Sequence, residues 1–235
     1  KTTATLLNRS EFAAIYWPKI KVVNPNTAVF GKATTVLADP SGFVAGLYAH
    51  TAGGKQGGVY TAPAGVERGI LRGGVGLETD EAFKESARDL VYPVRINPIT
   101  ALPGTPIFID GSRTLKGTSN FPSIPERRGV IFIEQSIKDA MLFAKHTNND
   151  QKLRRSVNRT VTSFLLRQLA DGAFASSKPE EAFFVDTSDA LNTASVIASG
   201  ILKVRIGLAT NKPTEFIVLE FSQDTRRLDE EAALA

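Results

Sequence analysis

The segment NDQKLRRSVNRTVTSFLLRQLADG, residues 149–172, carries the clearest secondary-structure signal of the chain. Its apolar residues recur at three- and four-residue spacing, which places them on one side of a helix. Asp150 can cap the free amides of the first turn, and Gly172 is typical of a helix end. The pattern predicts a helix over Gln151–Ala170 whose buried stripe consists of Leu153, Val157, Val161, Phe164, Leu165 and Leu169.

The opposite side of this predicted helix is basic. It is formed by Arg154, Arg155, Asn158, Arg159 and Thr162. Apart from Asp150, almost no carboxylate lies within one helical turn of the three arginines. A charged helix face is often a solvated surface. The alternative is an acidic partner, because arginines without neighbouring carboxylates project a positive field outward.

Further elements flank this helix on both sides. An amphipathic helix over 129–146 is predicted by the spacing of Ile133, Ile137, Ala140, Met141 and Ala144. A short buried strand over 182–185 follows the second helix, and strands over 202–208 and 215–221 can form a hairpin across Asn211-Lys212-Pro213. The result is an α+β unit of two helices on a three-stranded sheet. Its open edges are suited to accepting another chain, and residues 222–235 form a polar tail.

The preceding part of the chain predicts a different, α/β arrangement. Strands over 20–23 and 34–37 form a hairpin, and a helix over 43–49 is capped by Ser41. A helix from Thr79 to about Leu90 precedes strands over 91–96 and 106–110, which are typical of the last strands of an α/β sheet. Residues 115–125, rich in Gly, Ser and Pro, have the composition of a linker or long surface loop. We therefore expect two domains, residues 1–116 and 117–235.

Composition excludes several classes of protein. The 235 residues are 42% hydrophobic and 22% charged, with no apolar run long enough to cross a bilayer, so no membrane partner is expected. The formal net charge of +4 is too small for a dedicated nucleic-acid binder, so no nucleic-acid partner is expected. Cysteine is absent, which excludes disulfides and thiolate metal sites. With only His50 and His146 as imidazoles, we predict no metal site and no cofactor.

Several short blocks, taken in order, resemble the tail-sheath proteins of contractile phage tails and related contractile injection systems. The resemblance covers about Arg9 to Phe221. The blocks are Phe12–Pro18, Pro40–Ala49, Tyr60–Ala64, Gly111–Leu115, Arg127–Arg128 with Phe132–Ile137, Asn149–Asp150 with Leu153–Val157, Pro179–Val185 and Pro213–Val218. The chain departs from the family pattern at Ala209–Lys212, where an Ala-Pro pair is more usual, and in its Gly-rich loop near Gly53.

The resemblance implies a fold and a function. Residues 1–116 would be the C-terminal part of a subtilisin-like α/β sheet domain, and residues 117–235 the small α+β domain of the sheath with its C-terminal arm. An N-terminal arm and the opening of the larger domain would precede these residues. The implied function is a structural, non-enzymatic subunit of the virion tail, assembled in the bacterial host cytoplasm. Many copies would polymerise helically around an inner tail tube protein, in contact with baseplate and tail-terminator proteins, and contract to drive the tube through the target envelope.

The alternative is a soluble α+β hydrolase or binding module. Gly117-Thr118-Ser119 is similar to a subtilase nucleophile turn, His50 is a candidate base, and Asp39 is the upstream carboxylate that could orient it. Asn120-Phe121-Pro122 after Ser119 cannot continue as the helix that a subtilase nucleophile opens. We therefore predict no catalytic residue.

Two sets of residues are predicted to serve assembly. Arg154, Arg155 and Arg159 are expected to face an acidic inner tube, although the preceding helix is an alternative. The second set would exchange strands between subunits, and consists of Glu215, Phe216, Ile217, Val218, Leu219, Glu220 and Phe221. The competing interpretation of the second set is an internal hairpin with 202–208.

Overall fold

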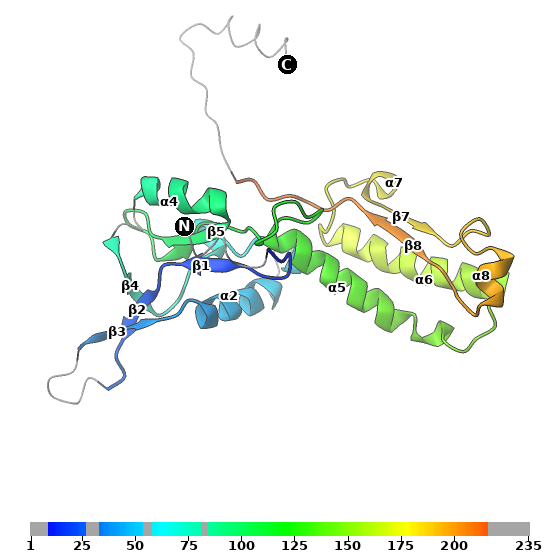
Figure 1. The fold of residues 1–235 in the computed structure, drawn as a ribbon, viewed down its shortest axis with the longest axis horizontal. Coiled ribbons are helices and arrows are strands. Elements are labelled where there is room, and N and C mark those ends of the chain that lie inside the picture. Colours follow the sequence, from blue (N-terminus) through cyan, green and yellow to red (C-terminus); the bar gives the residue numbers. More distant parts are fainter. Residues whose placement is uncertain (1–8, 27–32, 54–57, 81–83, 216–235) are drawn as a thin grey trace, which may run out of the picture.

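The computed structural model describes residues 9–26, 33–53, 58–80 and 84–215. It is an elongated mixed α/β molecule, with two hydrophobic cores connected by α5 (Ile124–Ala140) (Figure 1). None of the helices in these ranges is both long and apolar enough to cross a membrane.

Two small sheets surround the first core. In one, β1 (Ile15–Trp17) runs parallel to β5 (Ile96–Thr100), and β6 (Phe108–Ile109) is antiparallel on the other side of β5. In the other, β2 (Ile20–Val23) lies between antiparallel β3 (Thr35–Ala38) and β4 (Gly74–Leu77). Helix α2 (Ser41–Gly53) contributes Val44 and Leu47 to this core. Its other buried members are Ile20, Leu71, Leu77, Ile99, Ile107 and Ile109.

Short helices complete this half of the molecule. They are η1 (Gly58–Tyr60), α3 (Gly65–Arg68), α4 (Glu85–Val91) and η3 (Tyr92–Val94). Arg95 follows η3 with a left-handed backbone, φ 67°, and β5 begins at the next residue. This turn positions Tyr92 beside the residues that follow β6.

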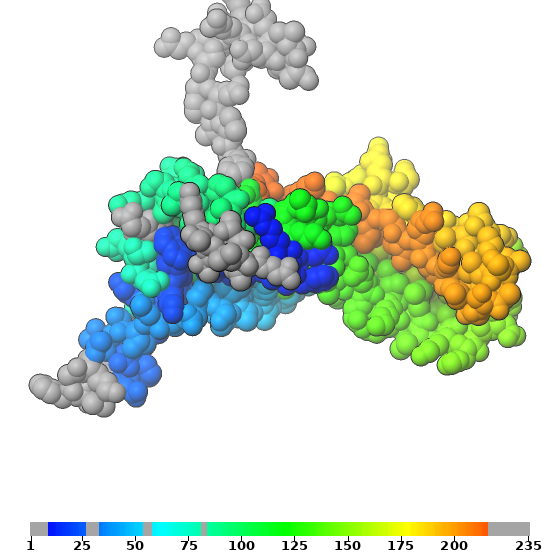
Figure 2. Space-filling view, in the orientation of Figure 1, coloured from blue at the N-terminus to red at the C-terminus, as the bar shows by residue number. Residues whose placement is uncertain are grey.

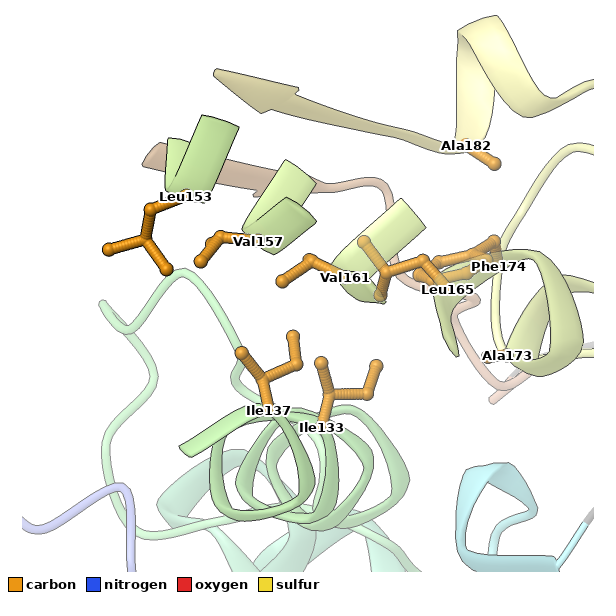
Figure 3. Close-up of a cluster of buried hydrophobic side chains, with 9 residues drawn as sticks. All are labelled: Ile133, Ile137, Leu153, Val157, Val161, Leu165, Ala173, Phe174 and Ala182. Atoms are coloured by element: carbon orange, nitrogen blue, oxygen red, sulfur yellow. The ribbon is translucent and has the colours of Figure 1, made fainter. Parts of the chain in front are cut away.

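The second core forms between α5 and α6 (Gln151–Ala170), and Figure 3 shows Ile133 and Ile137 facing the row of Leu153, Val157, Val161 and Leu165. The remaining elements are η4 (Leu142–Ala144), α7 (Pro179–Ala182), β7 (Phe183–Asp186), α8 (Ala194–Ala198) and β8 (Arg205–Leu208). Strands β7 and β8 pair antiparallel, with Phe183 opposite Leu208 and Asp186 opposite Arg205. They cover α6 on the side away from α5.

The first turns of α5 hold the two halves together through arginine side chains. Arg128 donates to the carbonyl of Tyr48 on α2 at 3.1 Å, and its guanidinium lies 4.5 Å from the centre of that ring. Arg127 pairs with Glu11 at 3.4 Å and lies 4.2 Å from the centre of the Phe12 ring. Charged and aromatic contacts thus attach the start of the helix to the first half, while its later turns belong to the second core.

Several predicted elements are confirmed. Helix α6 has the predicted bounds, and the Asp150 carboxylate accepts a hydrogen bond from the amide of Leu153 at 2.7 Å as its cap. The β2–β3 hairpin and the helical conformation of residues 43–49 are also observed. A strand forms near 182–185, but its predicted burial was wrong, since Phe184 is 55% exposed and the other residues of β7 are only partly buried. Helix α2 starts at Ser41 itself, so this residue belongs to the first turn rather than preceding it.

Other boundaries were wrong for identifiable reasons. The helix predicted over 129–146 begins at Ile124, because Ser123 and Glu126 form a reciprocal capping box, and it ends at Ala140. Residues 115–125 are consequently not a linker, since Leu115, Ser123 and Ile124 are buried. The strand predicted over 91–96 is largely η3, and that predicted over 202–208 begins only at Arg205.

The helix predicted from Thr79 begins at Glu85, with residues 81–83 outside the described ranges. The C-terminal sheet has two strands among the described residues, because the third, predicted over 215–221, lies outside them except for Glu215.

Candidate assembly surfaces

A line of cations follows the exposed side of α6. Arg155 and Arg159 are exposed, and Lys152 lies one turn before Arg155 on the same side. Within the described ranges, none of the three forms an ion pair with a carboxylate. Lys152, Arg155 and Arg159, called here the basic stripe, therefore present their positive charge to solvent. Lys152 was missed by the sequence prediction, although its three- and seven-residue spacing to the two arginines could have identified it.

Arg154 does not belong to this exposed stripe, which corrects the prediction. Its side chain is buried, with Nη2 donating to Oδ1 of Asp189 at 2.8 Å and Nη1 donating to the Asn149 carbonyl at 3.4 Å. A residue advances about 100° around an α-helix, so Arg154 and Arg155 point in different directions. Asp189 is 35 positions away in the chain, beyond the reach of a search within one helical turn.

Two other members of the predicted basic face also turn towards the sheet. Asn158 donates to the carbonyl of Val185 on β7 at 3.3 Å, and Thr162 donates to Asn158 at 3.4 Å. The predicted face therefore splits into a structural row against β7 and the solvent-facing basic stripe. Only Arg155 and Arg159 of the predicted tube-facing arginines remain available to a partner.

The outer edge of β8 is unpaired among the described residues. The amide of Ala209 donates to the carbonyl of Ala182 at 2.8 Å. This bond shows that Ala209, and with it every second residue of β8, directs its backbone groups towards β7. Backbone groups of successive residues in an antiparallel strand point alternately to its two neighbours. Those of Ile206 and Leu208 consequently point away from β7, to an edge with no strand beside it in the described structure. Such an edge is a template for a further strand.

An apolar groove of about 1040 Å³ lies beside this edge. One wall is α5, with Ile133, Ile137 and Met141, and the other includes Val204 and Ile206. Charged side chains at its border are Glu134, Lys138 and Lys145. A strand added to β8 would place every second side chain against these walls, because side chains alternate between the two faces of a strand.

The chain after β8 leads away from this groove. Thr210 bridges to Phe174, and its hydroxyl donates to Glu126 on α5 at 3.1 Å. Residues 211–214 line a shallow cavity with Tyr60 and Pro125. Figure 2 shows the orange and red surface of this segment crossing the green surface that begins α5. The segment thus runs from the second core back towards the first.

Glu215 ends the described chain in an ion pair with Arg113. Nε of Arg113 lies 3.1 Å from both carboxylate oxygens of Glu215, and Nη2 lies 2.5 Å from Oε2. The guanidinium also lies 3.8 Å from the centre of the Tyr92 ring. Glu215 was predicted to begin an exchanged strand, and its observed role is this pair. Residues 216–221 of that prediction lie outside the described residues.

The charges around Glu215 favour its ionised form. Burial by itself raises the pKa of Glu215. The hydrogen bonds and positive charge of Arg113, together with Tyr92 and Arg95, lower this pKa by more than burial raises it, so the net shift is downward. Burial and the nearby Glu215 charge raise the pKa of Tyr92 to about 12. Arg113 and Glu215 therefore meet as fully charged partners at neutral pH.

The three candidate residues of a hydrolase triad, Ser119, His50 and Asp39, have separate surroundings. Ser119 hydrogen-bonds to Glu11, and its oxygen also accepts from the amide of Phe121 at 3.1 Å. His50 and Asp39 line a separate cavity of about 620 Å³ against α2, and Ser119 is not among the residues lining it. Asp39 instead pairs with Lys19 at 3.0 Å. The geometry does not bring the three residues together.

The sequence of the chain is similar to that of a known protein. No family model matches the chain. It is 28% identical over 183 residues to the tail sheath protein of Vibrio phage KVP40, an alignment that covers 77% of this chain and 26% of the phage protein.

Solved structures give a similar result. The sheath complex of an extracellular contractile injection system, PVC, in its contracted state matches with a TM-score of 0.81 and 30% identity, covering 96% of this chain and 60% of that one. A chain of the anti-feeding prophage baseplate matches with a TM-score of 0.80 and 29% identity, covering 93% of this chain and 56% of that one. The chain thus spans between about a quarter and three fifths of these relatives. In sequence and in fold the chain is thus similar to contractile tail sheath proteins.

Proposed function

We propose that the chain belongs to a structural subunit of a contractile sheath, with no catalytic role. Many copies would polymerise helically around an inner tube, and contraction of the polymer would drive the tube through the target envelope. The observation that carries this proposal is the edge of β8, which is unpaired among the residues that the structure describes and lies beside an apolar groove, in a fold that matches a contractile sheath complex. An edge of this kind is suited to joining one subunit to the next through main-chain hydrogen bonds.

The strand that completes this edge is proposed to be 216–221 of another copy. In this segment Ile217, Leu219 and Phe221 share one side of an extended strand. Laid against β8, that side would fill the groove next to Ile137 and Ile206. Main-chain bonds depend little on side-chain identity, so the joint can persist while neighbouring subunits change their relative orientation.

The basic stripe is proposed to face the inner tube. Arg155 and Arg159, together with Lys152, offer a positive line suited to an acidic partner. Support comes from their lack of ion pairs among the described residues, in contrast to the buried Arg154. Residues 1–116 are further proposed to be the end of a subtilisin-like domain and 117–235 the small sheath domain. The parallel β1–β5 pair and the two separate cores support this division.

The remaining partners are proposed from the resemblance to sheath proteins. Contacts with baseplate proteins are proposed because one matching chain comes from a baseplate structure. Contacts with a tail terminator, a place in a virion or injection-system tail, and assembly in the host cytoplasm are proposed on the family resemblance alone.

Negative-stain microscopy of the purified protein tests the proposed function. We expect hollow tubes whose number rises with protein concentration. Val218→Pro removes one backbone donor from the proposed exchanged strand, and we expect it to leave soluble folded monomers that form no tubes. Lys212→Pro, outside that strand, is the matched control and should still assemble. A wild-type protein that stays monomeric at every concentration would contradict the proposal.

A further inference from the structure

We propose that the groove beside β8 binds an extended segment of a second copy in one direction, and that Lys138 and Lys145 set this direction by holding a carboxylate of that segment. The inference rests on the proposed function, because it concerns the occupant of the same groove in a polymer of identical subunits. It adds the chemical character of the occupant and the orientation in which it binds.

The two ends of the groove are identified by contacts on either side of β8. The carbonyl of Ile201, before β8, accepts a hydrogen bond from Asn149 at 2.9 Å, so β8 begins near the connection between α5 and α6. Thr210, just after β8, donates to Glu126 in the first turn of α5 at 3.1 Å. Strand β8 and helix α5 therefore run in opposite directions along the groove.

The groove is long enough for a short strand. Val130 and Met141 both line it, and the part of α5 between them is roughly 16 Å long. This length corresponds to about five extended residues, of which every second one points into the groove. The main-chain groups of Ile206 and Leu208 that face away from β7 can bond to such a strand. Apolar side chains at alternate positions are therefore the first property of the occupant.

The charges of the groove are distributed unevenly along its length. Lys138 and Lys145 belong to the end at which β8 begins, whereas the uncharged Phe121 and Val130 line the other end. Both lysines are exposed, and within the described ranges neither forms an ion pair with a carboxylate. Glu134 lies one turn before Lys138 and would repel a carboxylate placed nearer the middle. Of the residues that line the groove, those at the lysine end therefore attract a carboxylate.

A carboxylate at the lysine end determines the direction of the bound segment. If the acidic residue follows the apolar residues, the segment runs from the level of Leu208 towards that of Arg205, antiparallel to β8. Antiparallel pairs are slightly more stable than parallel ones. Main-chain bonds and the apolar wall supply most of the affinity, while exposed charges mainly decide orientation. The expected occupant is an extended segment with alternating apolar residues followed by Asp or Glu.

Peptides with blocked termini test the charge preference. The first has Ile, Leu and Val at alternate positions, Thr between them and Glu at its C-terminal end; in the second, Gln replaces this Glu. We expect the Glu peptide to bind the wild-type protein roughly tenfold more tightly at low salt, and the difference to shrink as salt rises. Fluorescence anisotropy measures both affinities. Lys138→Gln with Lys145→Gln should abolish the difference. Lys152→Gln, which removes an exposed lysine outside the groove lining, is the matched control and should behave as wild type.

Disulfide cross-linking in the cysteine-free chain tests the direction. Each peptide carries a cysteine at its C-terminal end, and the protein carries either Leu142→Cys at the lysine end or Phe121→Cys at the other end. The peptide with a C-terminal Glu should cross-link to the Leu142→Cys protein. A peptide of the same composition with Glu at its N-terminal end should bind in the reverse direction and cross-link to the Phe121→Cys protein.

Three results would overturn the inference. They are equal binding of the Glu and Gln peptides, cross-linking of both Glu peptides at the same end, and no measurable binding of either peptide by the folded protein. Each of them leaves the proposed function standing when the protein still forms tubes. Absence of tubes would reject the proposed function, and the peptide affinities would still decide whether the groove prefers a carboxylate at its lysine end.

Discussion

Arg154 directs its guanidinium into the protein, 2.8 Å from the Asp189 carboxylate, while Arg155, the next residue, points to solvent. Two adjacent arginines thus have different roles. One connects α6 to the segment after β7, and the other contributes to the basic stripe. This difference yields separate expectations for stability and for assembly.

Arg154→Ala should destabilise the protein by about 1–3 kcal/mol, because it removes a buried donor to Asp189 and Asn149. Asp189→Asn should cost less, since the Asp189 side chain is 75% exposed and water can replace much of the contact. Urea unfolding followed by circular dichroism measures both. Arg155→Ala is the control and should change the unfolding free energy by less than about 0.5 kcal/mol. Equal losses for Arg154→Ala and Arg155→Ala would refute the assignment.

Charge reversal in the basic stripe should affect assembly and leave the fold intact. Arg155→Glu with Arg159→Glu is expected to weaken association with purified inner tubes, while the thermal midpoint changes little. Salt should weaken the association of wild type by screening, so the gap between the two proteins narrows as salt rises. Co-sedimentation with tubes over a salt series measures this. Normal binding by the double variant at low salt would eliminate a tube-facing role for the stripe.

Gly129 and Gly46 should respond in opposite directions to alanine, although both lie inside helices. Alanine normally stabilises a helix by about 1 kcal/mol relative to glycine, and a Cβ at Gly46 would meet nothing within 4 Å. At Gly129 it would lie 2.7 Å from Cδ1 of Tyr60, whose hydroxyl is tied to Gln168 at 2.7 Å. We expect Gly129→Ala to destabilise by about 1–3 kcal/mol.

Thermal unfolding compares the two glycine variants. Gly129→Ala combined with Tyr60→Leu should recover part of the loss, because the smaller side chain makes room for the methyl group. If Gly129→Ala stabilised the protein as Gly46→Ala does, the close contact of α5 with Tyr60 would be wrong.

Acid should weaken the Arg113–Glu215 ion pair. Burial raises the pKa of Glu215, but the hydrogen bonds and charges of Arg113, Tyr92 and Arg95 together lower it, so the net shift from the ordinary value of 4.5 is downward. A carboxylate with a lowered pKa contributes stability above the unfolded-state value, and this contribution is lost as the pH falls through the folded-state pKa. The difference in thermal midpoint between wild type and Glu215→Gln should be constant above about pH 5 and shrink in more acidic buffer. A difference that is independent of pH down to acid unfolding would show that the charge of Glu215 has no part in it.

Local signals in the sequence determined much of the secondary structure in the C-terminal half of the chain. The bounds of α6 follow from its apolar period and the Asp150 cap, because both act within one or two turns. The sequence blocks were also enough to indicate the similarity to sheath proteins. The start of α5 could also have been predicted, because Ser123 and Glu126 have the three-residue spacing of a capping box. The surrounding Pro, Ser and Asn residues led instead to the prediction of a linker.

Tertiary structure alone decided which charges are free and where the chain goes after β8. Arg154 finds Asp189 across 35 positions, and Arg113 finds Glu215 across 102. No local pattern encodes either pair, because such contacts exist only once separate elements have packed together. The sequence favours a turn at Asn211-Lys212-Pro213, whereas the folded chain stays extended there. The ion pair holds Glu215 beside Arg113, and a tertiary contact of this kind can outweigh a local turn preference.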